Sequence, residues 1–115
     1  MSYDYRILID GKLTKPVNGE TMEVINPANN TVAAVVPKCG VEDVNLAVEA
    51  ANRAREGWRG TYIGDRSELL LKLAAIIREH EAELAPIETM QYGGPISKTS
   101  RFDIPFAPAE LEYMA

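Results

Sequence analysis

The chain has 115 residues, of which 46% are hydrophobic and 25% are charged, a composition typical of one small globular domain. Its formal net charge is −5 with acids and bases interspersed, which argues against nucleic acid and anionic membranes as partners. No apolar run is long enough for a signal peptide or a membrane span, and a single cysteine excludes an internal disulfide. We therefore expect a cytoplasmic protein.

Short β-prone runs separated by turn residues occupy the first third of the chain. The dipeptide Asp10-Gly11 is typical of a hairpin turn, and Pro27 ends a strand because proline cannot donate to a strand ladder. The runs cover residues 6–9, 12–13, 21–25 and 31–36. Together they predict an antiparallel β meander over about residues 6–36.

From Gly40 onward the apolar residues recur at helical spacing. We expect Gly40 to cap the first helix and Gly57 and Gly60 to end it. Pro86 removes a helical hydrogen bond and crowds the preceding turn, so a break is expected between His80 and Pro86. The predicted helices cover about residues 41–57, 63–80, 82–91 and 103–115.

The ends of the later helices follow from capping residues. The second helix is expected to begin at an Asp65 cap or equally near Thr61, and Gly93 is expected to end the third in a left-handed C-cap. Residues 96–101 are then a connector, and Asp103 caps the last helix. That helix shows no stop signal before the chain ends, so we expect it to be cut off.

One wide apolar stripe dominates the second and third helices. Its spacing places these residues on a single helical face, with His80 filling the one gap. The stripe comprises Leu70, Leu73, Ile77, Leu84 and Ile87, and Leu69 and Ile76 widen it beyond a coiled-coil seam. A face this wide needs a sheet or several helices to cover it, and we expect the chain to contain only part of that partner.

Four residue types that often carry chemistry have plainer interpretations here. Cys39 has no activating base nearby in sequence, so a passive side chain is favoured over a thiolate nucleophile. His80 is more readily a packed or capping residue than a general base or metal ligand. Trp58 favours a packing role over ligand stacking. Gly93-Gly94 follows a helix, which favours a C-cap over a phosphate loop.

Four segments, taken in order, carry a family pattern. They are VINPANNTVAAVVP, EDVNLAVEAANRAREGWRG, DRSELLLKLAAIIREHEAELAPIETMQYGGP and DIPFAPAELEYMA. The series resembles the N-terminal part of the aldehyde dehydrogenase superfamily over about residues 7–115. The resemblance implies an α/β fold in which residues 1–115 open the NAD(P)-binding domain. In that fold the β meander is followed by three to four helices, which pack on a Rossmann-like parallel sheet formed downstream.

The resemblance also implies a chemistry. Members oxidise an aldehyde to a carboxylic acid with NAD or NADP, using a cysteine nucleophile and a glutamate base, and we expect the parent to be a homo-oligomer. The pattern places these groups after position 115, so the chain itself supplies no catalytic and no cofactor-binding residue. Cys39 has no counterpart to the nucleophile.

A structural monovalent cation site is the one site that the resemblance carries over in part. Its positions correspond to the backbone carbonyls of Val24 and Ile25 and the side chain of Gln91. The family pattern has an aspartate at the last position, so the neutral glutamine would hold a hard cation more weakly.

Two functions of different classes remain open. The chain is either the N-terminal portion of an aldehyde-oxidising enzyme or a truncated, non-catalytic remnant that acts as a structural or interaction module. A reading frame that continues beyond Ala115 favours the first interpretation, and a stop codon favours the second.

Overall fold

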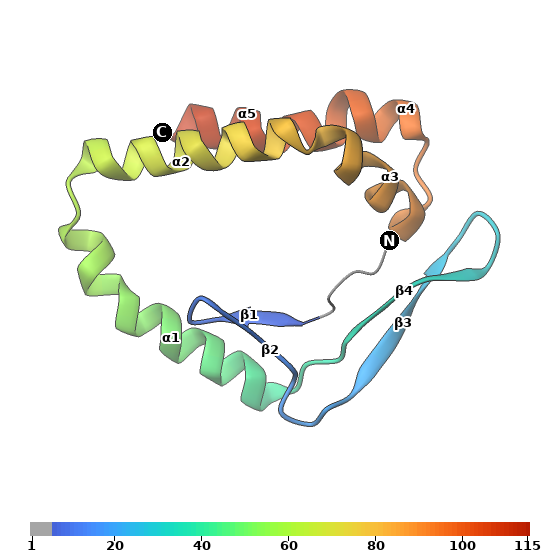
Figure 1. Ribbon diagram of the computed structural model, residues 1–115, viewed down its shortest axis with the longest axis horizontal. Coiled ribbons are helices and arrows are strands. Elements are labelled where there is room, and N and C mark those ends of the chain that lie inside the picture. The colour runs from blue at the N-terminus through green and yellow to red at the C-terminus, as the bar shows by residue number, and fades with distance from the viewer. Residues whose placement is uncertain (1–5) are drawn as a thin grey trace. The chain divides into compact units, whose positions relative to one another are not determined.

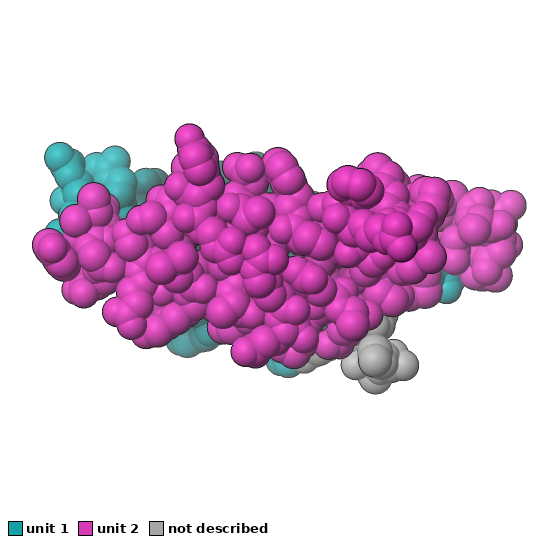
Figure 2. All heavy atoms as spheres, turned by 90° about the horizontal axis from the view of Figure 1, so that it is seen from above, with its two compact units in different colours: residues 1–25, 32–60 teal, residues 26–31, 61–115 magenta. Residues whose placement is uncertain are grey.

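The computed structural model describes residues 6–115, which form two compact units (Figure 2). Of the described residues, the first unit contains 6–25 together with Val32–Gly60. The second contains Asn26–Thr31 and Thr61–Ala115. The strands and the first helix belong mainly to the first unit, and the remaining helices belong to the second (Figure 1).

The first sheet is a tight hairpin of β1 (Ile7–Ile9) and β2 (Lys12–Thr14). Ile9 pairs with Lys12 in antiparallel register, which leaves a two-residue loop. Both loop residues have positive φ, 53° at Asp10 and 71° at Gly11, as a type I′ turn requires. The hairpin predicted at this dipeptide is therefore confirmed.

The second sheet pairs β3 (Thr21–Asn26) with β4 (Thr31–Pro37) and shares no strand with the first. The strands predicted as one meander thus form two separate two-stranded sheets. The reason lies between β2 and β3, where the amide of Gly19 donates to the carbonyl of Pro16 at 2.9 Å and φ of Gly19 is 67°. This local turn redirects the chain before β3 can extend the first hairpin.

The first helix, α1 (Val41–Gly60), continues beyond the predicted span of about 41–57 and ends at Gly60, the second of the two glycines expected to stop it. Isolated glycines in a helix cost only about 1 kcal/mol, so Gly57 lies within α1 instead of ending it. At the other end the amide of Val44 donates to the carbonyl of Gly40 at 3.3 Å, as expected for an N-cap at Gly40.

The second unit is built from helices: α2 (Ile63–Glu79), α3 (Glu81–Tyr92), α4 (Ile96–Lys98), the π-helix η1 (Thr99–Asp103) and α5 (Ile104–Met114). The break between α2 and α3 falls at His80, whose φ of −105° and ψ of 8° depart from helical values. Of the two starts that the sequence allowed for α2, the one near Thr61 is confirmed, and Asp65 is not the cap. Tyr62 precedes α2, and Asp65 lies in its first turn, where its charge complements the helix dipole.

The segment predicted as a connector is helical. Residues 96–101 belong to α4 and to η1, and Asp103 closes the π-helix without a side-chain capping bond. Its carboxylate instead accepts from the Lys98 ammonium at 2.7 Å. Asp103 thus occupies the position before α5 that the sequence predicted, but its side chain pairs with Lys98, five residues earlier, instead of capping the helix.

Helices α2 and α5 lie side by side and run in opposite directions (Figure 1). Arg78 of α2 makes a two-pronged bond to Glu112 of α5, with Nε–Oε1 and Nη2–Oε2 distances both 2.8 Å. The Ser67 hydroxyl donates to the carbonyl of Ala115. These contacts give α2 part of the helical partner that its apolar stripe requires.

Burial within residues 6–115 is shallow. The buried apolar side chains outside proline are the small ones of Ala50, Ala74 and Ala85. Of the predicted stripe, Leu73 stays 46% exposed, and the other members are only half-buried. Among the helices of the described residues, none is long and apolar enough to cross a membrane.

Gly93 is expected to be intolerant of a side chain. Its φ is 79°, and a Cβ built there would lie 2.5 Å from Cγ of Pro27. Gly93→Ala should therefore lower the stability of the α3 terminus by about 1–3 kcal/mol. Amide exchange around the Gly93 N–H, which donates to the Thr89 carbonyl at 2.9 Å, measures this loss.

The matched control is Gly57→Ala in α1, where a Cβ meets nothing within 4 Å. It should raise helical stability by up to about 1 kcal/mol. Equal effects of the two substitutions would contradict the steric and conformational role given to Gly93.

Candidate functional site

The three residues predicted as cation ligands are distributed over both units. Val24 and Ile25 lie on β3 in the first unit, and Gln91 is an exposed residue of α3 in the second. Within residues 6–115, no group of three or more histidine, cysteine, aspartate or glutamate side chains is arranged to hold a metal ion.

Cys39, His80 and Trp58 are all accessible. Cys39 is a free, exposed thiol. His80 is exposed, pairs through Nδ1 with Glu83 Oε2 at 3.2 Å, and links the end of α2 to the start of α3. Trp58 remains 46% exposed in α1, so it is not buried in its own unit as a packing anchor would be.

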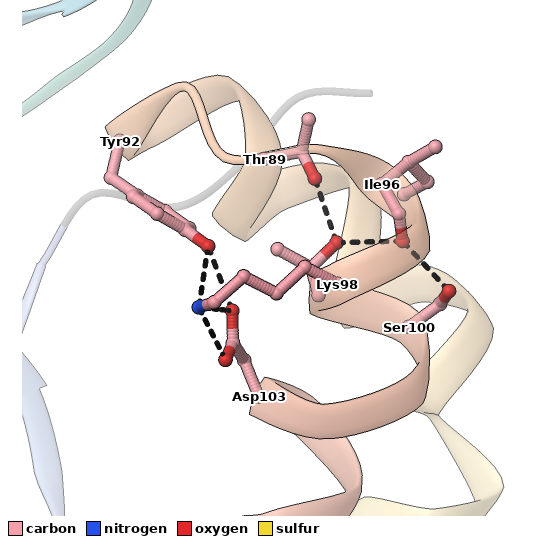
Figure 3. A network of polar contacts seen from close by, with 7 residues as sticks. Thr89, Tyr92, Ile96, Lys98, Ser100 and Asp103 are labelled. Atoms are coloured by element: carbon pink, nitrogen blue, oxygen red, sulfur yellow. Dashed lines mark hydrogen bonds and ion pairs between the residues drawn. The ribbon is translucent and has the colours of Figure 1, made fainter.

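The densest polar cluster of the second unit joins Tyr92, Lys98 and Asp103 (Figure 3). The Lys98 ammonium lies 2.7 Å from both carboxylate oxygens of Asp103. The Tyr92 hydroxyl donates to Asp103 Oδ2 at 2.7 Å and accepts from Lys98 at 3.3 Å. Lys98 Nζ also lies 5.5 Å from the centre of the Tyr92 ring, within cation–π range.

A shallow hollow of about 490 Å³ adjoins this cluster. Aromatic residues supply most of its apolar wall, and its charged groups are one lysine and two acids. The lining residues are Glu88, Tyr92, Lys98, Phe102, Asp103 and Phe106. Phe102 and Phe106 are 68% and 64% exposed, so the hollow is an open surface feature.

The cluster fixes the charge of each member near neutral pH. The hydrogen bond from Lys98 lowers the pKa of the Asp103 carboxyl, and the Tyr92 hydroxyl adds to this effect. The Asp103 carboxylate in turn raises the pKa of the Lys98 ammonium and the pKa of the Tyr92 phenol. An ionised acid, a charged lysine and a neutral phenol stabilise one another, so none is poised to transfer a proton near neutral pH.

Linkage gives the pH range of this stabilisation. Because the pKa of Asp103 is lowered, its contribution is lost as the pH falls through the folded-state value. Because the pKa values of Lys98 and Tyr92 are raised, theirs are lost as the pH rises through the folded-state values. The cluster is therefore complete across the neutral range.

Asp103→Ala is expected to move the phenol titration of Tyr92 downward, because it removes the largest cause of the raised pKa. The measurement is the alkaline ultraviolet absorbance titration, with Tyr92→Phe identifying the Tyr92 contribution. An unchanged titration curve in Asp103→Ala would show that the hydrogen bond does not form in solution.

Sequence patterns did not identify this cluster. Tyr92 lay beside a glycine stop signal, Lys98 in an expected connector, and Asp103 at an expected cap. The cluster forms because η1 places Lys98 and Asp103, five residues apart, one above the other. The unusual five-residue spacing carries no helical signal of its own.

Comparisons of the sequence and of the structure with known proteins agree on one family. The model of the family described as "Aldehyde dehydrogenase family" matches residues 14–115. A solved gamma-glutamyl-gamma-aminobutyraldehyde dehydrogenase from Burkholderia cenocepacia J2315 is 37% identical with a TM-score of 0.94, over 98% of this chain and 23% of its own.

Two further similar proteins were solved in complex with nicotinamide adenine dinucleotide. PnpE in complex with nicotinamide adenine dinucleotide is 35% identical with a TM-score of 0.90, over 94% of this chain and 22% of its own. The AldA indole-3-acetaldehyde dehydrogenase of P. syringae, a C302A mutant in complex with NAD+ and IAA, is 30% identical with a TM-score of 0.93, over 98% of this chain and 23% of its own. The chain thus spans less than a quarter of these relatives' length.

Proposed function

The chain belongs to the aldehyde dehydrogenase family, and from this we propose that it serves as the N-terminal portion of an enzyme that oxidises an aldehyde to a carboxylic acid with NAD or NADP. The match over residues 14–115 carries the proposal. The cofactor assignment is supported by the relatives solved with nicotinamide adenine dinucleotide. The cysteine nucleophile of that chemistry is proposed to lie outside this chain.

We assign residues 1–115 to the opening part of the NAD(P)-binding domain. The half-buried stripe on α2 and α3 supports this role, since those helices need a further apolar layer. In the proposal that layer is a Rossmann-like parallel sheet contributed by later chain. The parent enzyme is proposed to be a cytoplasmic homo-oligomer.

The cation site is retained as a proposal from the family resemblance. Its ligands are the backbone carbonyls of Val24 and Ile25 and the side-chain carbonyl of Gln91. A neutral amide in place of a carboxylate makes the site weak for a monovalent cation.

The test of the proposed function is expression of the complete reading frame. Its product is expected to form NADH or NADPH in the presence of an aldehyde. A stop codon directly after Ala115 would instead favour the alternative, a non-catalytic remnant with a structural or interaction role.

The 115-residue chain alone is expected to be catalytically silent. Its one thiol, Cys39, is exposed and pairs with no general base in the described residues, so nothing activates it as a nucleophile. The assay compares NADH formation with the uncatalysed rate and includes Cys39→Ala, which should change nothing. Oxidation above the uncatalysed rate would contradict the assignment of the chemistry to residues outside this chain.

A further inference from the structure

The helical segment from Ile96 to Met114 changes its hydrogen-bond pattern once, at η1. The amide of Ile104 donates to the carbonyl of Thr99, five residues back, where an α-helix would use the fourth. A π-helical turn therefore holds one residue more than the α-helical turn it replaces. Everything after it is rotated by about 100° relative to an uninterrupted α-helix.

Bonds to α3 fix the chain on the N-terminal side of this turn, and we call them the α3 anchor. The buried hydroxyl of Thr99 lies 2.8 Å from that of Thr89 and also donates to the Ile96 carbonyl at 3.1 Å (Figure 3). Lys98 and Asp103 span the turn and meet at 2.7 Å. In an α-helix, residues five apart point about 140° away from each other, so this ion pair needs the wider turn.

Bonds to α2 fix the chain on the C-terminal side, and we call them the α2 anchor. The Arg78–Glu112 fork has matched distances of 2.8 Å, and planar two-pronged pairs of this kind tolerate little rotation. The bond from Ser67 to the Ala115 carbonyl adds a second point on the same helix. Both anchors lie within the second unit.

We infer that the chain between the α3 anchor and the α2 anchor contains one residue more than an α-helix would fit. The wider turn of η1 accommodates this residue and so sets the rotation of α5. In this register Phe102 and Phe106, one turn apart, both line the hollow beside Tyr92. If an α-helical turn replaced η1 while the α3 anchor stayed in place, α5 would rotate, which would turn Phe106 away from the residues before the turn and break the Arg78–Glu112 fork. An α-helical turn is therefore incompatible with both anchors at once.

Pro105 offers a simpler cause that must be separated from this one. A proline ring crowds the carbonyl four residues before it, here that of Arg101, and a widened turn relieves that contact. If the proline alone produces η1, the anchors are incidental. The two explanations differ in what happens when a residue is deleted or the proline is replaced.

The decisive comparison is between two single-residue deletions in the product of the complete reading frame, Ser100 within η1 and Ala109 within α5. Both residues are exposed. Deleting Ser100 is expected to give a continuous α-helix in which Lys98 and Asp103 become four residues apart and both anchors survive. Deleting Ala109 rotates Leu111 and Glu112 away from α2.

Hydrogen–deuterium exchange of the α5 amides, resolved by mass spectrometry, reads the result. Deletion of Ser100 should leave exchange within about twofold of the parent chain, and deletion of Ala109 should accelerate it roughly tenfold, because local opening becomes easier when the helix loses its packing. Any other ranking, including equal acceleration by both deletions or by neither, overturns the inference.

Pro105→Ala provides a second measurement that does not change chain length. If the anchors hold the turn, exchange in α5 stays within about twofold of the parent chain, since the anchor bonds are unaltered. If exchange accelerates as far as in the Ala109 deletion, the proline rather than the anchors maintains the register, and the inference is wrong.

Discussion

Asp43→Ala is expected to loosen the start of α1 and to lower the local stability of the first unit by about 2–4 kcal/mol. The Asp43 side chain is only 3% exposed, and each of its oxygens accepts one backbone hydrogen bond. Oδ2 accepts from the amide of Gly40 at 2.8 Å, and Oδ1 accepts from the amide of Val17 at 2.8 Å. Alanine would leave both part-buried amides without a partner, which is costlier than losing a pair of exposed bonds.

Amide exchange at Val17 and Gly40 measures this effect directly, and far-UV circular dichroism follows the helix. Asp43→Asn retains one acceptor oxygen and should lose about half as much stability. The matched control is Glu42→Ala, whose side chain is exposed in the same helical turn and should change stability by less than about 0.5 kcal/mol. Equal effects of Asp43→Ala and Glu42→Ala would contradict the buried capping role.

Asp43 makes one contact that local sequence patterns predict and one that they do not. The sequence places an acid at the positive end of a helix after a capping glycine, and the structure has that arrangement. The bond to Val17, 26 residues away, is a tertiary contact that no spacing rule encodes. Local capping chemistry was thus predictable, and its connection to the loop before β3 was not.

The helices of the second unit likewise combine features that local patterns predict with features that they do not. Pro86 predicted a break nearby, and the break occurs at His80, whereas Pro86 itself lies inside α3, beyond its first turn. The segment 96–103 was missed as a helix because glycine and proline flank it. Pro105 is a local feature that would favour a widened turn there, but Asp103 appeared to be an ordinary cap.

The second large effect concerns the whole 115-residue chain, which we expect to be partly molten or self-associating. Of the large aliphatic side chains on α2, Leu69, Leu73 and Ile76 are 49%, 46% and 53% exposed. Fully burying one such side chain contributes about 1.5–3 kcal/mol, whereas a whole domain is stable by only about 5–15 kcal/mol. A few uncovered residues therefore decide whether the side chains are fixed.

The first unit also leaves large aliphatic side chains exposed. Val44 and Val48 of α1 are 55% and 53% exposed, and its two-stranded sheets are too small to be stable without further packing. The helices are expected to form, because their hydrogen bonds are local, while tertiary packing remains loose. Exposed apolar faces of this extent also favour association between copies.

Binding of a hydrophobic dye, followed during a thermal scan, tests most directly the claim that these helices belong to a larger parallel-sheet domain. Sedimentation on the same sample reports self-association, and the product of the complete reading frame is the matched control. We expect the 115-residue chain to bind the dye at low temperature and to melt without a sharp transition, and we expect the control to do neither. A compact monomer with a sharp transition and no dye binding would show that the core is complete without that sheet.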